Sequence, residues 1–368
     1  MMALFTSLVT SGHLYLIVGI AATQVYAFKE VACLVNQGQS PLIARSSRAL
    51  SWYLFIVAMY YCHGEALCYY FSHVVSKGSI LTNLAIGYHR FLILLLYLLS
   101  YVYLIGTARL EHIKGQLKQF VSTHFAVFWI VAPGYYAIQA TLEGLIWFLL
   151  PAALVVMNDI FAYVCGRSFG RTSLLRVSPK KTVEGFVGAW IITMISSIAI
   201  AYGLQQHTFF TCKANNLGAS IWTGLSYTKS LPFVPQAYEI PFIANPLNIA
   251  PVYAHALVLA TFASLLAPFG GFFASAVKRS MHVKDFGAII PGHGGVVDRI
   301  DCQLFMMLIA CMYYHAFVFL AASSSVLMRY STGGDAKIDM VIGMVHELVR
   351  SGVPLEAIVQ RMGSIGQA

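Results

Sequence analysis

Three aspartates gather in one short stretch of the chain. Only six Asp occur among the 368 residues, and Asp285, Asp298 and Asp301 all fall within residues 275–301. Asp298 and Asp301 stand at positions i and i+3, which on a helix sets both carboxylates on one face. Magnesium is typically held by one or two carboxylates together with substrate phosphates. These three residues are therefore candidate ligands for one or two such ions.

The same stretch carries cations and glycines suited to a phosphate-bearing substrate. Three glycines, Gly292, Gly294 and Gly295, would permit close backbone approach to an anion at a helix N-terminus. The stretch also holds four cationic residues: Lys278, Arg279, Lys284 and Arg299. Together these features predict a site for a metal-bound polyphosphate. The alternative is that the cations only anchor a membrane loop and that residues 298–301 form an ordinary first helical turn with a local ion pair.

A second polar element lies at residues 158–184. Asn158 and Asp159 interrupt an apolar run, where a polar pair needs partners. Ser178-Pro179 resembles a turn that leads into a helix, with Thr182 and Glu184 close to the start of that helix. Basic residues surround this turn: Arg167, Arg171, Lys180 and Lys181. Attraction to anionic lipid headgroups alone could also explain these basic residues.

The elements that must position these residues are membrane helices. The chain is 58% hydrophobic and 10% charged, against roughly 25% charged in an ordinary soluble domain. Mean hydropathy is +0.72. Continuous apolar runs of about 20 residues predict helices that cross the bilayer. We expect an all-α polytopic membrane protein with about eight such helices (8–9), at 9–28, 51–75, 86–108, 120–140, 145–165, 184–204, 252–274 and 302–322.

The distribution of charge predicts how these helices are oriented. Of the 23 Lys and Arg residues, 15 lie in the loops after odd-numbered spans and only four on the other side. By the positive-inside rule, loops 166–183 and 275–301 both face the cytosol. We divide the chain into N-terminal membrane helices (1–140), a catalytic membrane domain (141–322) and an amphipathic C-terminal tail (323–368). Residues 205–250 are expected to form an ordered cap without chemistry.

The polar stretch 275–301 resembles the signature of the phosphatidate cytidylyltransferases, also called CDP-diacylglycerol synthases. The resemblance is carried by Ser275, Val277, Lys278-Arg279, Lys284-Asp285, Gly287, Ile290-Pro291, His293 to Val296 and Asp298 to Asp301. Residues 178–186, SPKKTVEGF, are similar to the family's second recurring element, and residues 158–171 to the one before it. The SPKKT form is more similar to the eukaryotic branch than to the bacterial one.

The resemblance implies a magnesium-dependent reaction in which the phosphate of phosphatidic acid attacks the α-phosphorus of CTP, giving CDP-diacylglycerol and pyrophosphate. It implies that Asp285, Asp298 and Asp301 hold Mg²⁺, with room for a second cation, and that Lys284 and Arg299 complete the catalytic set. It also implies a set of substrate-binding residues: Ser275, Lys278, Arg279, His293, Gly294, Gly295, Asn158, Asp159, Lys180, Lys181, Thr182 and Glu184.

The resemblance further implies a homodimer in the endoplasmic reticulum membrane, with CTP, phosphatidic acid and the bilayer as partners and no nucleic acid among them. Two other functions stay open at this stage. One is a related CTP-dependent transferase that acts on another membrane lipid, which would share the signature. The other is an anion transporter, which is disfavoured because no paired broken helices are evident and the carboxylates gather near one membrane face.

Overall fold

Long apolar helices make up most of the chain. The computed structural model describes residues 2–35, 41–74, 88–175, 178–213, 220–222, 231–238, 247–289, 292 and 294–319. The first helices along the chain are α1 (Met2–Ser11), α2 (His13–Val35), α3 (Pro41–Val74), α5 (His89–Gly106) and α6 (Ile113–Glu143). They are followed by α7 (Leu145–Phe169), α8 (Val183–Gln205), α9 (Thr208–Thr211), α10 (Val252–Leu265), α11 (Pro268–Ser280), α12 (Val297–Tyr313) and the π-helical η2 (Tyr314–Phe319).

Two small hairpins interrupt the helices. β1 (Ser173–Leu175) pairs antiparallel with β2 (Ser178–Thr182) between α7 and α8. The segment predicted as a turn at Ser178-Pro179 is thus a strand, although α8 begins close to Thr182 as expected. A short 3₁₀ turn, η1 (Leu231–Phe233), precedes the second hairpin, β3 (Gln236–Tyr238) with β4 (Leu247–Ile249). The structure describes only part of the predicted cap at 205–250. The predicted helices of the 330–368 tail lie outside the described residues.

The predicted all-α polytopic membrane architecture is confirmed. Among the described residues, seven helical segments are long and apolar enough to cross a membrane. Four of them, α5, α6, α7 and α8, coincide with predicted spans. The predicted span 252–274 is broken at Leu266–Ala267 into α10 and α11. Residues 51–74 of the predicted span 51–75 are helical and belong to α3, but α3 is not one of the seven, because its tyrosine, histidine and glutamate residues lower its hydropathy.

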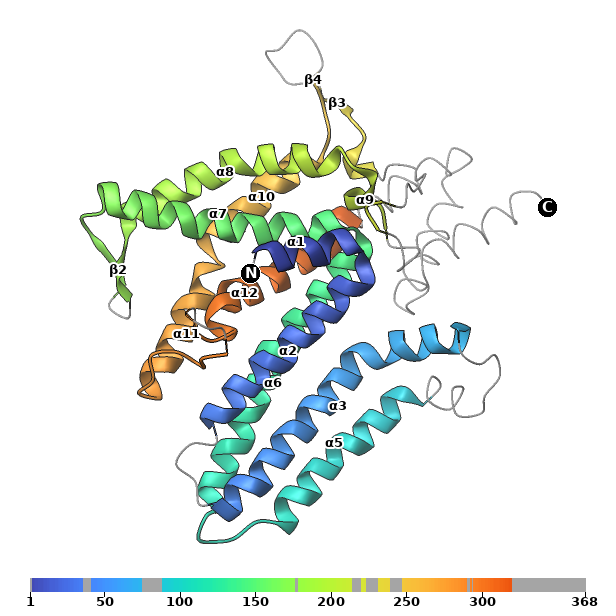
Figure 1. The fold of residues 1–368 in the computed structure, drawn as a ribbon, viewed down its shortest axis with the longest axis vertical. Helices are drawn as coiled ribbons and strands as arrows, with labels where there is room; N and C mark the ends of the chain where they lie inside the picture. Colours follow the sequence, from blue (N-terminus) through green and yellow to red (C-terminus); the bar gives the residue numbers. More distant parts are fainter. Residues whose placement is uncertain are drawn as a thin grey trace, which may run out of the picture. The chain divides into compact units, whose positions relative to one another are not determined.

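The helices pack as two neighbouring groups within one compact unit, Met1–Met312. α2, α3, α5 and α6 lie side by side, and α7, α8 and α10 form the second group (Figure 1). α6 and α7 join the groups through contacts of their own. All the residues discussed below belong to this unit.

A buried apolar cluster fills the space between α2, α3, α6 and the start of α12. Phe28 is fully buried and stacks on Phe55, with ring centroids 4.4 Å apart. Val297 at the start of α12 and Phe286 of the preceding loop belong to the same cluster. The loop that carries the predicted signature is therefore anchored in the apolar core by its own side chains.

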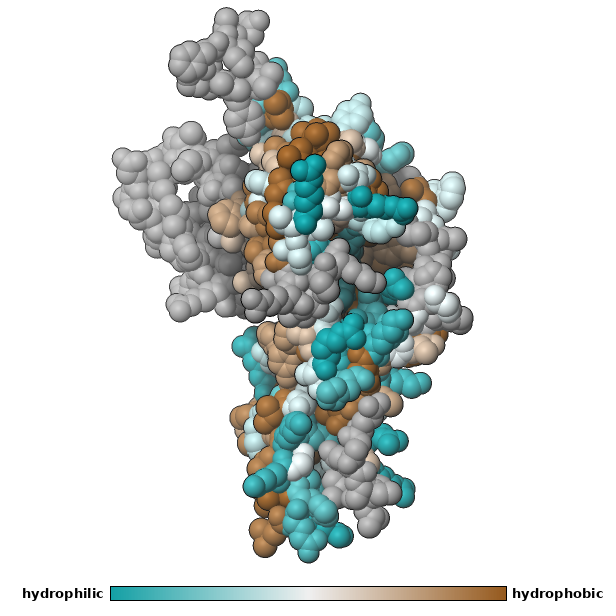
Figure 2. Space-filling model, turned by 90° about the vertical axis from the view of Figure 1, so that its left-hand side faces the viewer, coloured by the Kyte–Doolittle hydropathy of each residue, from teal (hydrophilic) through white to brown (hydrophobic). Residues whose placement is uncertain are grey.

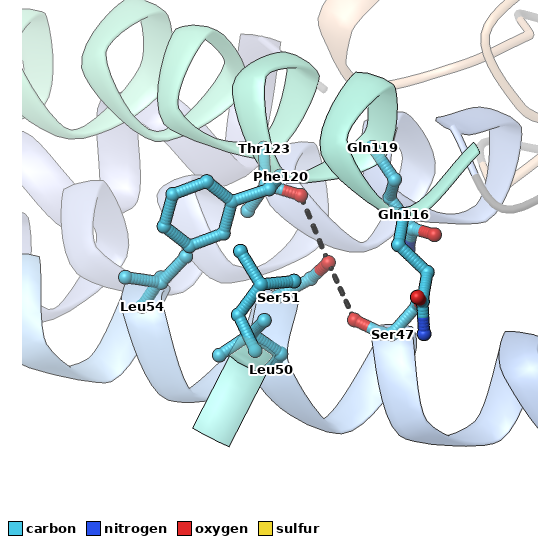
Figure 3. Close-up of a pocket in the computed structure, with 9 residues that line it drawn as sticks. Ser47, Leu50, Ser51, Leu54, Gln116, Gln119, Phe120 and Thr123 are labelled. Atoms are coloured by element: carbon cyan, nitrogen blue, oxygen red, sulfur yellow. Dashed lines mark hydrogen bonds between the residues drawn. The ribbon is translucent and has the colours of Figure 1, made fainter. Parts of the chain in front are cut away.

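Buried polar contacts hold the first helix group together. Ser51 of α3 and Thr123 of α6 are joined by a 2.9 Å hydrogen bond between their hydroxyls, and Ser51 also donates to the Ser47 carbonyl (Figure 3). Gln24 of α2 donates its side-chain amide to the Val131 carbonyl of α6 at 3.1 Å. Such bonds between helices are the usual polar contacts of membrane bundles, where no water competes for them.

Small residues let α7 and α8 approach each other closely. A Cβ atom added at Gly185 of α8 would lie 2.8 Å from the Ala162 carbonyl oxygen and 2.8 Å from the Gly166 Cα, both in α7. Glycine at this position is thus required by contact with the neighbouring backbone, which cannot move aside as a side chain could.

This contact predicts the effect of a single added methyl group. We expect Gly185→Ala to lower the thermal midpoint of the detergent-solubilised protein by several degrees, since overpacking a tight contact typically costs about 1–3 kcal/mol. Gly203→Ala in the same helix is the matched control, because a Cβ there meets nothing within 4 Å. Equal midpoints for the two variants would contradict the close packing of α7 and α8.

Candidate active site

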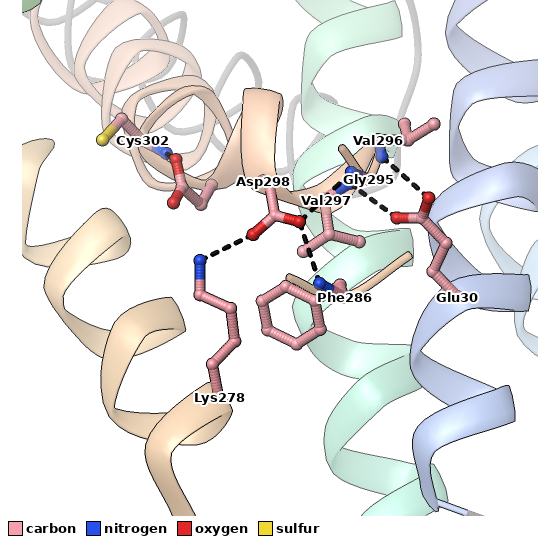
Figure 4. A network of polar contacts seen from close by, with 9 residues as sticks. Glu30, Lys278, Phe286, Gly295, Val296, Val297, Asp298 and Cys302 are labelled. Atoms are coloured by element: carbon pink, nitrogen blue, oxygen red, sulfur yellow. Dashed lines mark hydrogen bonds and ion pairs between the residues drawn. The ribbon is translucent and has the colours of Figure 1, made fainter. Parts of the chain in front are cut away.

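Asp298 lies in the first turn of α12 and is held by three donors. Its Oδ1 receives a 2.6 Å hydrogen bond from the Lys278 ammonium, and its Oδ2 accepts the backbone N–H groups of Phe286 at 2.9 Å and Gly295 at 3.3 Å (Figure 4). The Asp298 side chain is only 8% exposed. Its carboxylate thus joins the end of α11, the signature loop and the start of α12.

Lys278 lies at the end of α11, where cations are favoured by the helix dipole. Its side chain is 15% exposed, and its ammonium lies 5.5 Å from the centre of the Phe286 ring. This distance is within the range of a cation–π contact. The Lys278 ammonium therefore interacts mainly with two groups inside the protein, the Asp298 carboxylate and the Phe286 ring.

A second carboxylate, from Glu30 of α2, meets the start of α12. Glu30 is 3% exposed and accepts the backbone N–H groups of Val296 at 2.9 Å and Val297 at 3.0 Å (Figure 4). Sequence reasoning missed this residue, because the first predicted span ended at residue 28, two residues before Glu30, and no role was assigned to it. The available signal was an acidic residue directly after an apolar run, since such a residue needs partners.

The glycines of the signature loop make room for these two carboxylates. A Cβ added at Gly295 would lie 2.7 Å from Glu30 Oε2 and 2.8 Å from Asp298 Oδ2, and one at Gly287 would lie 2.6 Å from Glu30 Oε1. Gly292 and Gly294 have φ angles of +73° and +83°, in the region that favours glycine. The anions at this helix N-terminus are thus carboxylates of the chain itself. The N–H groups of Gly295, Val296 and Val297 all donate to them.

Asp301 lies one turn further along α12. Its Oδ1 accepts the backbone N–H of Cys302 at 2.7 Å. A Cβ on Gly271 of α11 would lie 3.5 Å from Asp301 Oδ2. The Asp301 carboxylate is close enough to Asp159 of α7 and to Lys278 to interact electrostatically with both. The two polar elements predicted from the sequence therefore meet at Asp301.

On the α7 side, Asn158 and Asp159 take different positions. Asn158 is 2% exposed, and its Oδ1 has no hydrogen-bond partner among the described residues. The Asp159 side chain is 49% exposed and lies 4.0 Å from the Lys181 ammonium, which is itself 45% exposed. Asp159 and Lys181 thus form a solvent-facing pair beside Asp301.

Thr182 and Glu184 stabilise the β1–β2 hairpin and the start of α8. The Thr182 hydroxyl accepts the Gly185 N–H at 3.2 Å, as an N-cap does. Glu184 accepts the backbone N–H groups of Arg171 and Thr172 and the Thr172 hydroxyl, at distances between 2.8 and 3.2 Å. Both side chains, predicted to bind substrate, are engaged in holding the hairpin that carries Lys181. The Lys180 side chain is not among those described.

The remaining predicted residues are mostly on the surface. Figure 2 views the side on which β2 and α11 lie in Figure 1, and hydrophilic side chains form a broken band down this face between apolar ones. Ser275 is half-buried in α11, and His293 lies outside the described residues. The exposed residues from the two polar elements are Arg167, Arg171, Lys181, Arg279, Lys284, Asp285 and Arg299.

The oxygen donors near Asp301 suit a hard divalent cation. Asp301 and Asp159 supply carboxylates that interact electrostatically, and the Asn158 amide oxygen is buried without a hydrogen-bond partner among the described residues. One or two carboxylates are what Mg²⁺ takes when substrate phosphates complete its shell. In the part of the chain that the structure describes, no three His, Cys, Asp or Glu side chains come close enough to hold an ion by themselves.

Comparison with known proteins places the chain among nucleotide-using enzymes. The model of the cytidylyltransferase family matches residues 1–317. The chain is 40% identical over 314 residues to the phosphatidate cytidylyltransferase of Saccharomyces cerevisiae, covering 84% of this chain and 68% of the relative. It is 37% identical to a putative phosphatidate cytidylyltransferase of Schizosaccharomyces pombe (86% and 74% covered) and 35% identical to phosphatidate cytidylyltransferase 1 of Homo sapiens (86% and 70%).

The Lys278–Asp298 pair predicts a pattern of stability changes. Lys278→Met leaves a buried carboxylate without its cation, which typically costs about 3–5 kcal/mol. We therefore expect a thermal midpoint several degrees lower in detergent. The double variant Lys278→Met/Asp298→Asn removes both charges, and we expect it to regain most of that loss.

The matched control is Lys213→Met, because Lys213 pairs with Glu143 at 3.3 Å while its own side chain is 47% exposed. Exposed pairs contribute little to stability, so this midpoint should stay near wild type. A double variant as unstable as Lys278→Met alone would contradict the buried ion pair.

Proposed function

The chain belongs to the cytidylyltransferase family, and on that premise we propose how this membrane nucleotidyltransferase makes CDP-diacylglycerol. A phosphate oxygen of phosphatidic acid attacks the α-phosphorus of CTP. The bond between that phosphorus and the oxygen bridging to the β-phosphate breaks, and pyrophosphate leaves. The assignment is carried by the family match and the named relatives, and it is supported by the electrostatic interaction of Asp301 with Asp159 of α7 and Lys278 of α11.

Catalysis of this kind depends on positioning and charge neutralisation, because the attacking oxygen is already an anion. No side chain is needed as a nucleophile. We assign Asp301 and Asp159 to holding Mg²⁺ together with substrate phosphates. Asp285 is assigned to the same ion from the family resemblance alone, and Asp298 is paired with Lys278. When bound, Mg²⁺ would neutralise phosphate oxygens and favour departure of pyrophosphate.

The phosphate clamp in this proposal is made of side chains. The backbone amides at the start of α12 already bind Glu30 and Asp298, and Lys278 is paired with Asp298. We therefore assign the binding of CTP and of the lipid phosphate to the exposed cations of the two polar elements: Lys181, Arg279, Lys284 and Arg299. Lys180 and His293 are assigned to the same task from the family resemblance alone.

The setting of the reaction is part of the proposal. CTP is multiply charged and cannot cross hydrocarbon unaided, so its site must open to the compartment that contains it. Phosphatidic acid can reach the same site laterally from the adjacent leaflet. We therefore place the site on the cytosolic face of the endoplasmic reticulum membrane, in agreement with the Lys and Arg distribution, and we extend the family resemblance to a homodimer.

The role of Asp301 predicts a loss of turnover without a loss of structure. We expect Asp301→Asn to lower formation of CDP-diacylglycerol from CTP and phosphatidic acid by about a hundredfold or more, roughly 2.7 kcal/mol of transition-state stabilisation. The purified protein in detergent should remain monodisperse. Glu143→Gln is the matched control, because Glu143 is a carboxylate that pairs with Lys213 away from the site. Wild-type turnover for Asp301→Asn at limiting Mg²⁺ would contradict the metal assignment.

The sidedness of the site gives a separate prediction. A cysteine at exposed Ser173, in a cysteine-free background that retains turnover, should react with an impermeant thiol reagent in sealed endoplasmic reticulum vesicles whose cytosolic face is outward. Trp222 is 85% exposed and follows α8 on its other side, so a cysteine there should stay protected until the vesicles are opened. Protection at position 173 together with labelling at position 222 in sealed vesicles would contradict the proposed orientation.

A further inference from the structure

Glu30 ties the first long helix to the signature loop. Its carboxylate accepts the N–H groups of Val296 and Val297, which lie 266 and 267 residues further along the chain. We propose that Glu30 is a positioning residue for the reaction: it fixes the first turn of α12 and thereby the direction in which Asp298 and Asp301 point. This inference rests on the proposed function for its catalytic part only.

The first turn of α12 has a specific need for such a partner. The amides at a helix start have no acceptor within the helix, and here they are buried, since Val297 is fully buried and Gly295 is buried as well. Asp298 accepts the Gly295 amide, and Glu30 accepts the next two. Three consecutive amides are thus shared between two carboxylates, and the one on α2 comes from outside the signature.

The arrangement also explains where the two negative charges are neutralised. Lys278 pairs with Asp298, whereas Glu30 is held by the backbone N–H groups of Val296 and Val297. The positive end of the α12 dipole favours a carboxylate there. Without Glu30, two amides at the start of α12 would lose their acceptor, which is unfavourable in a buried site, and the turn that carries Asp298 would loosen.

Gly287 offers an independent way to disturb the same contact. The three atoms nearest to a Cβ added at Gly287 are Oε1, Cδ and Cγ of Glu30, at 2.6, 2.8 and 2.9 Å. Gly287→Ala therefore pushes the Glu30 carboxylate away without removing it. Gly115→Ala in α6 is the matched control, because a Cβ there meets nothing within 4 Å.

The first test measures the contact itself and needs neither metal nor substrate. Hydrogen–deuterium exchange is followed in the metal-free full-length protein in detergent, for wild type, Glu30→Gln, Glu30→Ala and Gly287→Ala. We expect peptides that contain residues 295–298 to exchange at least tenfold faster in Glu30→Ala. Glu30→Gln should be intermediate, because its carbonyl oxygen can still accept one N–H. Peptides from α8 should be unchanged.

The second test measures the catalytic consequence as kcat per monodisperse molecule. We expect Glu30→Ala and Gly287→Ala each to lower kcat about tenfold or more, as loss of residues that orient metal-site carboxylates typically does. The double variant Glu30→Ala/Gly287→Ala should be no slower than Glu30→Ala alone, because the added methyl group at position 287 then has no Glu30 carboxylate to clash with. A purely structural role predicts instead fewer folded molecules with an unchanged kcat for each of them.

The outcomes separate this inference from the proposed function. If the wild-type protein does not turn over CTP, the proposed function fails while the exchange experiment still decides whether Glu30 holds α12. If the wild type is active, unchanged exchange at 295–298 in both Glu30 variants, or wild-type kcat in Glu30→Gln and Gly287→Ala, would overturn the role of Glu30.

Discussion

The buried N-terminus of α12 is the constraint on which the rest of the site depends. A helix that starts inside a membrane protein leaves amides that neither water nor lipid can satisfy. Here the acceptors are Glu30 from α2 and Asp298 from α12 itself. Because Asp298 also binds Lys278 of α11 and the Phe286 amide, one local requirement brings α2, α11, α12 and the signature loop together.

This solution has an electrostatic consequence for phosphate recognition. Internal carboxylates occupy the helix N-terminus that a glycine-rich turn would otherwise offer to a phosphate. One cation of the signature, Lys278, forms an ion pair with Asp298. In the proposed function, recognition of CTP and of the lipid headgroup therefore falls to exposed cations from separate elements: Lys181 on the β1–β2 hairpin, Arg279 in the last turn of α11 and Lys284 in the loop after it. Such side chains can adapt to a diffusible substrate in a way that a closed backbone turn cannot.

Much of this architecture follows from the sequence, because apolar runs and a dense polar signature are local patterns. The helices α5 to α8 and the meeting of the two polar elements were predictable in this way. Glu30 was not, since an acid after an apolar run indicates a need for partners but not which ones, and its partners begin 266 residues further along the chain. The break between α10 and α11 and the strand at Ser178–Thr182 depend on tertiary packing. Thr182 and Glu184 illustrate a further limit: a polar residue in a motif can serve the fold that presents the site.

The most direct measurement of the central claim follows the fate of each phosphate of CTP. Purified protein in detergent, which has no compartments, is supplied with phosphatidic acid, Mg²⁺ and CTP labelled at either the α- or the γ-phosphate. The account predicts that the α-label enters the lipid fraction, that the γ-label leaves in pyrophosphate, and that both transfers stop when Mg²⁺ is chelated. A γ-label in the lipid, or no label in the lipid from either position, would contradict it.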